Sequence, residues 1–217
     1  MPIVCGQAGD AAFLLMEYLD LTVKSADGAA RLGQALAKQH RHIGPNFGWQ
    51  RNNTIGSTPQ PNKWETDWIE FYRSKRLGHQ LQLAAGKDYS KNIVETGQLL
   101  EERLPAFFEN YQPKPSLLHG DLWGGNWGVT VDGDAVIFDP AVYYGDRETD
   151  IAMTTLFGGF SKEFYVAYND SWPMDEGYQQ RRDLYNLYHV LNHMNLFGTG
   201  YAGQAQSMMQ KLLAEIR

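Results

Sequence analysis

The hydrophobic and polar positions follow a strand period at the start of the chain and a helical period over much of the rest. Apolar residues in 3–5 and 13–18 flank Gly9 and Asp10, which predicts two short strands joined by a turn. Residues 44–62 are rich in Gly and Pro, and we expect a long loop there. Apolar positions three and four residues apart predict helices over 30–42, 64–85 and 92–111.

The middle of the chain has a different pattern. A short apolar strand is predicted over 116–119, followed by a Gly-rich stretch and a hairpin with arms at 127–131 and 135–138. Helical spacing then returns, and the predicted helices cover 148–157, 162–169, 175–196 and 203–216. Because strands and helices are segregated along the chain, the pattern predicts an α+β fold that is mainly helical.

Composition and charge exclude several classes of protein. With 43% hydrophobic and 20% charged residues the chain is typical of a globular protein, and it has no run of about 18 apolar residues that could span a membrane. The single cysteine, Cys5, excludes a disulfide framework and fits a cytoplasmic location. A net charge of −6 without a basic cluster argues against nucleic acid as a partner.

One short stretch carries residues suited to phosphoryl transfer. Asp121 and Asn126 are separated by four residues, as are the base and the metal-binding Asn of the kinase catalytic loop. Asp139 follows the predicted hairpin, and the hairpin would bring its carboxylate back to the same metal ion as Asn126. Any one of these residues alone could simply favour a turn. Together, with apolar flanks on both sides, they indicate Asp121 as the catalytic base and Asn126 and Asp139 as ligands of Mg²⁺.

Four other residues are assigned weaker roles. His119 is expected to brace the backbone of this loop, and Asp150 to support the loop from beneath as it does in kinase-like folds, although an acidic residue there also suits a helix start. The segment 15–19, which reads LMEYL, looks like a kinase hinge. There the carbonyl of Glu17 and the N–H of Leu19 would contact the adenine of ATP.

Two segments resemble the fructosamine (ketosamine) kinases more than kinases in general. One is His119 to Asn126, which reads HGDLWGGN. The other comprises Phe47-Gly48, residues 53–62 (NTIGSTPQPN), Trp64, Asp67-Trp68 and Arg76-Leu77. The resemblance runs through essentially the whole chain. It implies transfer of phosphate from ATP to the sugar 3-hydroxyl of fructosamines or ribulosamines, on free amines or glycated proteins. Trp123 then either stacks on the sugar or packs in the core.

The resemblance also implies an architecture: the helical large lobe of a protein-kinase-like fold in 21–217, with a strand remnant of the small lobe and the hinge in 1–20. No Lys or Arg precedes Lys24, and no Gly-x-Gly-x-x-Gly loop precedes the hinge, so we expect most of the small lobe to be missing. We expect reduced activity and self-association through the exposed edge. Two alternatives stay open: a related aminoglycoside-like small-molecule kinase, and a non-catalytic binding module derived from a kinase.

Overall fold

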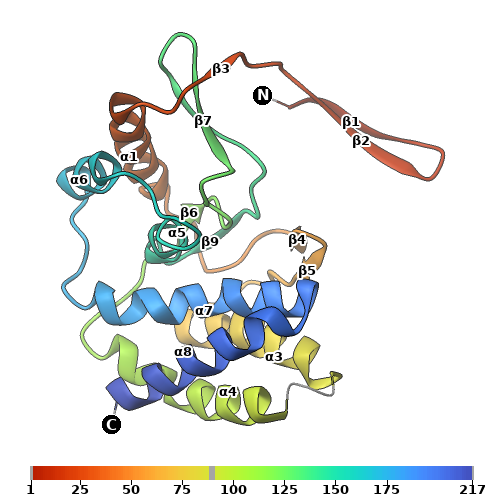
Figure 1. Cartoon of the computed structure of the whole chain (residues 1–217), viewed down its shortest axis with the longest axis vertical. Coiled ribbons are helices and arrows are strands. Elements are labelled where there is room, and N and C mark those ends of the chain that lie inside the picture. The colour runs from red at the N-terminus through yellow and green to blue at the C-terminus, as the bar shows by residue number, and fades with distance from the viewer. Residues whose placement is uncertain (1, 88–90, 217) are drawn as a thin grey trace.

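The structure, a computed structural model, describes residues 2–87 and 91–216. Figure 1 shows a projecting N-terminal hairpin, a small sheet region with α1 and α6 beside it, and a layer of helices that carries the C-terminus. Helices and strands are segregated along the chain, as the sequence predicted, and the fold is α+β. Of the helices in the described part, none is long and apolar enough to cross a membrane.

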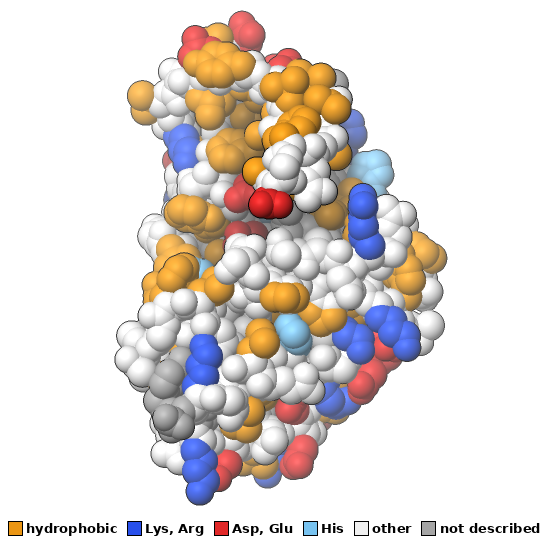
Figure 2. All heavy atoms as spheres, turned by 90° about the vertical axis from the view of Figure 1, so that its right-hand side faces the viewer, with side chains coloured by type: hydrophobic (Ala, Val, Ile, Leu, Met, Phe, Trp, Pro, Cys, Tyr) orange, Lys and Arg blue, Asp and Glu red, His pale blue; other side chains and the backbone are white. Residues whose placement is uncertain are grey.

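Strands β1 (Pro2–Ala8) and β2 (Ala11–Met16) form the N-terminal antiparallel hairpin. Its turn uses Gly9 at φ 60°, and every described residue of both strands is exposed. Figure 2 views the molecule from the side on which the hairpin projects, and hydrophobic side chains gather over its upper part. The predicted hairpin is therefore confirmed, and much of its apolar surface is open to solvent.

A three-stranded sheet carries the central hairpin. Its order is β3 (Leu21–Thr22), β7 (Trp127–Thr130) and β8 (Ala135–Ile137), all antiparallel. Helix α1 (Ala26–His40) follows β3 and packs against α6 (Lys162–Ser171). The side chain of Ser25 accepts a hydrogen bond from the N–H of Gly28 and so caps α1 earlier than the periodicity predicted.

Two small two-stranded sheets complete the strand pairing, and the strand predicted over 116–119 belongs to one of them. Strand β6 (Ser116–Leu118) pairs with β9 (Tyr143–Gly145), which the sequence did not predict. Strands β4 (Asn53–Ile55) and β5 (Thr58–Gln60) form a hairpin inside the predicted loop 44–62. Such short pairings leave almost no periodic signal, because each strand has only three residues.

The predicted helix over 64–85 begins later, at Trp68. The side chain of Asp67 accepts a hydrogen bond from the N–H of Glu70 at 2.8 Å and caps it. The segment consists of α2 (Trp68–Phe71), a π-helix (Tyr72–Leu77) and α3 (Gly78–Ala85). The remaining helical elements are α4 (Lys91–Arg103), a 3-10 turn (Leu104–Phe108), α5 (Glu148–Met153), α7 (Tyr178–Phe197), a 3-10 turn (Thr199–Tyr201) and α8 (Ala202–Glu215).

The hydrophobic core extends from α1, α6 and the central sheet to α7 and α8, and it contains a cluster of aromatic side chains around Trp68. Trp68, predicted to be a core residue, is buried and donates its indole N–H to the hydroxyl of Tyr185 at 3.1 Å. Tyr72 packs edge to face on Tyr185. Arg76, in the π-helix, is completely buried, and its guanidinium lies 3.9 Å from the ring centre of Tyr143.

Candidate active site

The segment His119–Asn126, called the catalytic loop below, leaves β6 through a sharp turn. Gly120 has φ 84°, a conformation that side chains rarely adopt, and a Cβ at this position would lie 2.1 Å from the carbonyl oxygen of Ala141. From beneath, Asp150 of α5 accepts hydrogen bonds from the N–H groups of His119 at 2.7 Å and Gly120 at 2.8 Å. The turn is therefore held by one buried carboxylate.

Asp121, Asn126 and Asp139 meet at the end of this loop. The amide nitrogen of Asn126 donates to the carbonyl oxygen of Asp121 at 2.9 Å, and it lies 3.5 Å from both the Asp121 carboxylate and the Asp139 carbonyl oxygen. Asn126 is buried, Asp121 half-buried and Asp139 exposed. Three residues that the sequence singled out thus lie side by side, although 18 positions separate the first from the last.

His119 links the catalytic loop to the segment that carries Asp139. Its Nδ1 accepts a hydrogen bond from the N–H of Asp121 at 3.2 Å, and its Nε2 donates to the carbonyl oxygen of Phe138 at 2.9 Å. A neutral ring with its hydrogen on Nε2 makes both bonds. Burial lowers the pKa of His119, and the nearby Asp150 carboxylate only partly opposes this.

The electrostatics of the loop favour a base at Asp121. Burial, followed by the negative charges of Asp139 and Asp150, raises the pKa of Asp121 to about 6. A carboxyl group with a pKa in this range is a better proton acceptor than an exposed carboxylate and is still mostly ionised at neutral pH. Asp121 can therefore take a proton from a hydroxyl group placed beside it.

Beside Asp121 lies a cavity of about 260 Å³, called the Asp121 pocket below. Its walls come from the β4–β5 hairpin, the catalytic loop, α5 and the C-terminal part of α7. The lining residues include Ile55, Gly56, Trp123, Met153, Phe157, Asn192, His193, Leu196, Phe197 and Tyr201. Asp121 is the one charged side chain among the described residues that line it, so the pocket suits an uncharged or cationic guest.

His193 is the centre of an aromatic wall in this pocket. Its ring centre lies 4.7 Å from that of Phe157, 5.2 Å from Tyr201 and 5.5 Å from Phe197. Its Nδ1 donates to the carbonyl oxygen of His189 at 2.8 Å, which leaves Nε2 as a hydrogen-bond acceptor. Sequence reasoning missed His193, because a histidine in a helical pattern carries no distinguishing signal.

Trp123 lines the same pocket and is 41% exposed, so it is not a core residue. Its indole lies over Gly125, where an added Cβ would be 2.3 Å from the ring. The half-open indole face next to Asp121 can stack on a sugar ring. Of the two interpretations of Trp123, the geometry favours the one in which it faces a ligand.

The predicted hinge lies apart from these residues. Glu17 and Leu19 belong to the extended segment between β2 and β3, which joins the sheet through a hydrogen bond from the N–H of Val131 to the carbonyl oxygen of Asp20 at 3.1 Å. Lys24, shortly after β3, donates to the carbonyl oxygen of Gly124 in the catalytic loop. The hinge segment therefore leads toward the loop, although its adenine contacts stay a prediction.

Among the residues described, no group of three or more His, Cys, Asp and Glu side chains is arranged to hold a metal ion by itself. The donors near Asp121 nevertheless fit a hard cation such as Mg²⁺, which takes few protein ligands and completes its shell with water and phosphate oxygens. The amide nitrogen of Asn126 is already used by Asp121, so its amide oxygen is the atom left for a cation. Asp139 adds an exposed carboxylate.

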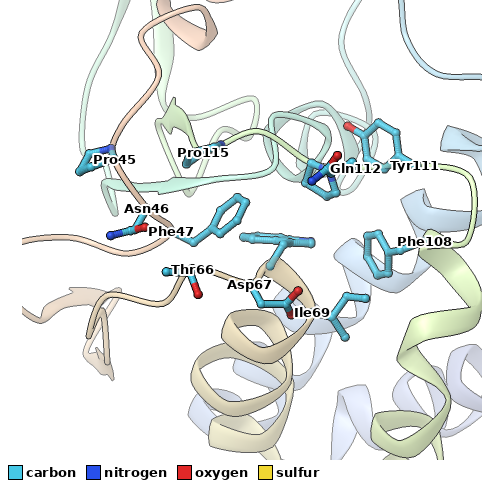
Figure 3. A pocket seen from close by; sticks show the side chains of 12 residues that line it. Pro45, Asn46, Phe47, Thr66, Asp67, Ile69, Phe108, Tyr111, Gln112 and Pro115 are labelled. Atoms are coloured by element: carbon cyan, nitrogen blue, oxygen red, sulfur yellow. The ribbon is translucent and has the colours of Figure 1, made fainter.

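A second cavity, of about 320 Å³, lies elsewhere and shares no lining residue with the Asp121 pocket. Figure 3 shows the side chains of Phe47, Phe108 and Tyr111 around it. Two of its polar side chains are already bonded: Asp67 caps α2, and the hydroxyl of Tyr111 donates to Asp146 at 2.9 Å. Asp121 and Trp123, which the sequence singled out, line the Asp121 pocket and not this second cavity.

Comparison with known proteins identifies the family of the chain. The family model described as "Fructosamine kinase" matches residues 1–215. The "Probable ketoamine kinase" of Synechocystis is 48% identical over 98% of this chain and 71% of its own length. The "Protein-ribulosamine 3-kinase, chloroplastic" of Arabidopsis thaliana is 44% identical over 95% of this chain and 63% of its own.

The fold agrees with this similarity. The crystal structure of a fructosamine-3-kinase-type protein from Haemophilus somnus superposes with a TM-score of 0.87 at 32% identity. The match covers 98% of this chain and 72% of that one. The relatives are thus longer than this chain, and the alignment takes in nearly all of its residues.

Proposed function

Because the chain belongs to the fructosamine kinase family, we propose that it transfers the γ-phosphoryl group of ATP to the 3-hydroxyl of the sugar in fructosamines or ribulosamines. The observation that carries the proposal is the meeting of Asp121, Asn126 and Asp139, of which Asp121 lines a pocket of about 260 Å³. The acceptor is a ketosamine on a small amine or on a glycated protein, as the names of the relatives suggest.

In this proposal Asp121 is the catalytic base. The acceptor oxygen forms a bond to the γ-phosphorus, the bond from that phosphorus to the bridging oxygen of ADP breaks, and the hydroxyl proton passes to the Asp121 carboxylate. Asn126 and Asp139 would hold Mg²⁺, which neutralises charge on the phosphates when bound. His119 and Asp150 keep the loop in place through the hydrogen bonds described above.

The acceptor sugar would lie in the Asp121 pocket with one face on Trp123. The indole is exposed there, and the other lining groups are aromatic or neutral polar. Such a pocket binds a sugar by stacking and hydrogen bonds and would accept the cationic amine of a ketosamine. An aminoglycoside carries several positive charges, and among the described lining residues only the Asp121 carboxylate could pair with them. The pocket therefore suits a ketosamine better than an aminoglycoside.

The N-terminal part would bind the nucleotide. We propose that residues 1–20 are strands and hinge of a small lobe, with the Glu17 carbonyl and Leu19 N–H on the adenine edge, and that 21–217 form the catalytic lobe. A cytoplasmic location is consistent with one exposed free cysteine. Self-association through the exposed β1–β2 hairpin belongs to the same proposal.

The direct test measures transfer of labelled phosphate from Mg·ATP to fructoselysine and to kanamycin, beside an Asp121→Asn variant. We expect transfer to fructoselysine alone and a loss of about a hundredfold or more in the variant. Transfer to kanamycin instead would favour the aminoglycoside-like alternative. Nucleotide binding without transfer to either acceptor would favour the binding-module alternative.

A further inference from the structure

The segment that carries Asp139 is held by side chains at almost every residue. Asp139 has φ 58°, which is unusual for a residue other than glycine and costs on the order of 1–3 kcal/mol unless its surroundings fix it. On one side, His119 donates to the carbonyl of Phe138 and the Asn126 amide lies near the carbonyl of Asp139. These contacts fix the segment from the catalytic loop.

From the other side, two amides of the β4–β5 hairpin reach the same segment. The amide nitrogen of Gln60 donates to the carbonyl oxygen of Ala141 at 3.1 Å, and that of Asn53 donates to the carbonyl oxygen of Val142 at 2.8 Å. Gln60 also donates to the Asn53 side-chain oxygen at 2.9 Å, so the two amides form one unit. The strained residue Asp139 therefore sits between two sets of hydrogen bonds.

The two amides are themselves firmly held. Gln60 is completely buried, and its side-chain oxygen accepts a hydrogen bond from the hydroxyl of Tyr188 at 2.8 Å. Asn62 donates to the Asn53 oxygen at 2.8 Å and accepts from the buried guanidinium of Arg76 at 2.8 Å. A network with its partners satisfied and buried is rigid, so it can fix backbone geometry.

We propose that Asn53 and Gln60 are positioning residues that hold the Asp139 carboxylate in place for the divalent cation that the proposed function requires. The proposal rests on that function and extends it to the segment 53–62, which marks the family in the sequence but has no role in the chemistry assigned so far. The tip of the same hairpin, Ile55 and Gly56, lines the Asp121 pocket. The β4–β5 hairpin thus contacts both the Asp121 pocket and the segment that carries Asp139.

The test measures metal binding without turnover. Mn²⁺ is titrated by electron paramagnetic resonance in the presence of a non-hydrolysable ATP analogue, for the parent chain and for Gln60→Met and Asn53→Asp. The first variant keeps the shape of the side chain without its amide, and the second keeps the acceptor oxygen without the donor. Each should weaken Mn²⁺ binding by about tenfold, the equivalent of one lost hydrogen bond.

Tyr72→Phe is the matched control, because it also removes a buried hydrogen bond to a backbone carbonyl, that of Leu184 at 2.7 Å. It should bind Mn²⁺ as the parent does. In turnover, kcat should fall in the two amide variants while KM for the acceptor stays within about twofold, since the pocket walls are unchanged. If Gln60→Met fails to fold, Mn²⁺ binding by Asn53→Asp alone tests the inference, because Asn53 is only half-buried and its replacement disturbs the core less.

Asp139→Asn separates failure of this inference from failure of the proposed function. If Asp139→Asn loses Mn²⁺ binding while both amide variants keep parental affinity, Asn53 and Gln60 do not position Asp139 and the inference is overturned. If Asp139→Asn binds like the parent, or if the parent binds no Mn²⁺, the metal site of the proposed function is wrong and the inference falls with it.

Discussion

The imidazole of His40 and the carboxylate of Asp150 are hydrogen-bonded at 3.1 Å in the interior of the protein, where both side chains are almost completely buried. Burial alone would raise the pKa of Asp150, but the hydrogen bond from His40, the electrostatic interaction with the His40 and His119 rings, and the hydrogen bond from the Gly120 N–H together lower it. Asp150 is therefore a buried anion whose partners come from α1 and from the catalytic loop.

Replacing Asp150 should destabilise the protein strongly. Asp150→Asn cannot accept from both loop N–H groups and His40 at once, so at least one buried donor loses its partner, and we expect a loss of about 3 kcal/mol in the free energy of unfolding. Urea denaturation at neutral pH measures it. Asp175→Asn, which removes a partly exposed partner of Arg181, is the control and should cost less than about 1 kcal/mol. Equal losses in the two variants would contradict the prediction.

His189 should make the protein less stable in mild acid. Burial first, and then the charges of His193 and Arg76 against the opposing effect of Asp150, lower the pKa of His189 from 6.5 to about 3. Between these pH values the unfolded chain binds a proton that the folded chain does not. The contribution of His189 to the free energy of unfolding is therefore complete above pH 6.5. It is lost as the pH falls toward 3, at about 1.4 kcal/mol per pH unit.

The measurement compares urea unfolding of the parent and His189→Gln from about pH 7.5 to about pH 5. Glutamine does not titrate, so the variant should lose about 2 kcal/mol less than the parent over this range. Other acids and bases contribute equally to both curves, and the difference isolates His189. Parallel curves for the two proteins would show that His189 is protonated in the folded state as easily as in the unfolded one.

The sequence was informative where a residue type and its spacing encode chemistry. Asp121, Asn126 and Asp139 were found from their residue types, their spacing and the apolar residues around them, and the structure brings them together. Their roles stay a proposal. The long helices were also predicted, because an amphipathic period persists over many residues. Their ends were less accurate, since a single cap such as Ser25 or Asp67 decides where a helix begins.

The features of the fold and the site that the sequence did not predict depend on contacts between distant segments of the chain. Strand β9 pairs with β6 through only three residues, and the amide of Asn53 meets Val142 across 89 positions. The sequence marked 53–62 as typical of the family but gave no partner for its amides. His193 likewise gained a candidate role only when α7 placed it beside Phe157 and Asp121. Such relations arise from packing and leave no local periodic signal.

Gly120 should not tolerate a side chain. Gly120→Ala would place a methyl group 2.1 Å from the carbonyl oxygen of Ala141 at φ 84°, so the catalytic loop and the Asp139 segment must separate. We expect a loss of about 3 kcal/mol or more in the free energy of unfolding, from clash and backbone strain together. Gly124→Ala, where nothing lies within 4 Å of the added Cβ, is the control and should be nearly as stable as the parent. Similar stability of both variants would contradict the close approach.

Gly125 provides a test of Trp123 that leaves the indole itself intact. An alanine at Gly125 would put its Cβ 2.3 Å from the far end of the Trp123 ring, which is partly exposed and can rotate away. Stability should therefore change by less than about 1 kcal/mol. If the ring stacks on the acceptor sugar, its rotation should raise KM for fructoselysine about tenfold while KM for ATP stays unchanged.

The double variant decides between stacking and a general disturbance of the loop. Trp123→Ala alone should raise KM for fructoselysine about as much as Gly125→Ala, and the two changes together should raise it no further, because both act on the same contact. Additive increases would mean that Gly125→Ala distorts the catalytic loop, including Asp121, independently of the indole. An unchanged KM in Trp123→Ala would remove Trp123 from the acceptor site and leave the aromatic wall around His193 as the surface that receives the sugar.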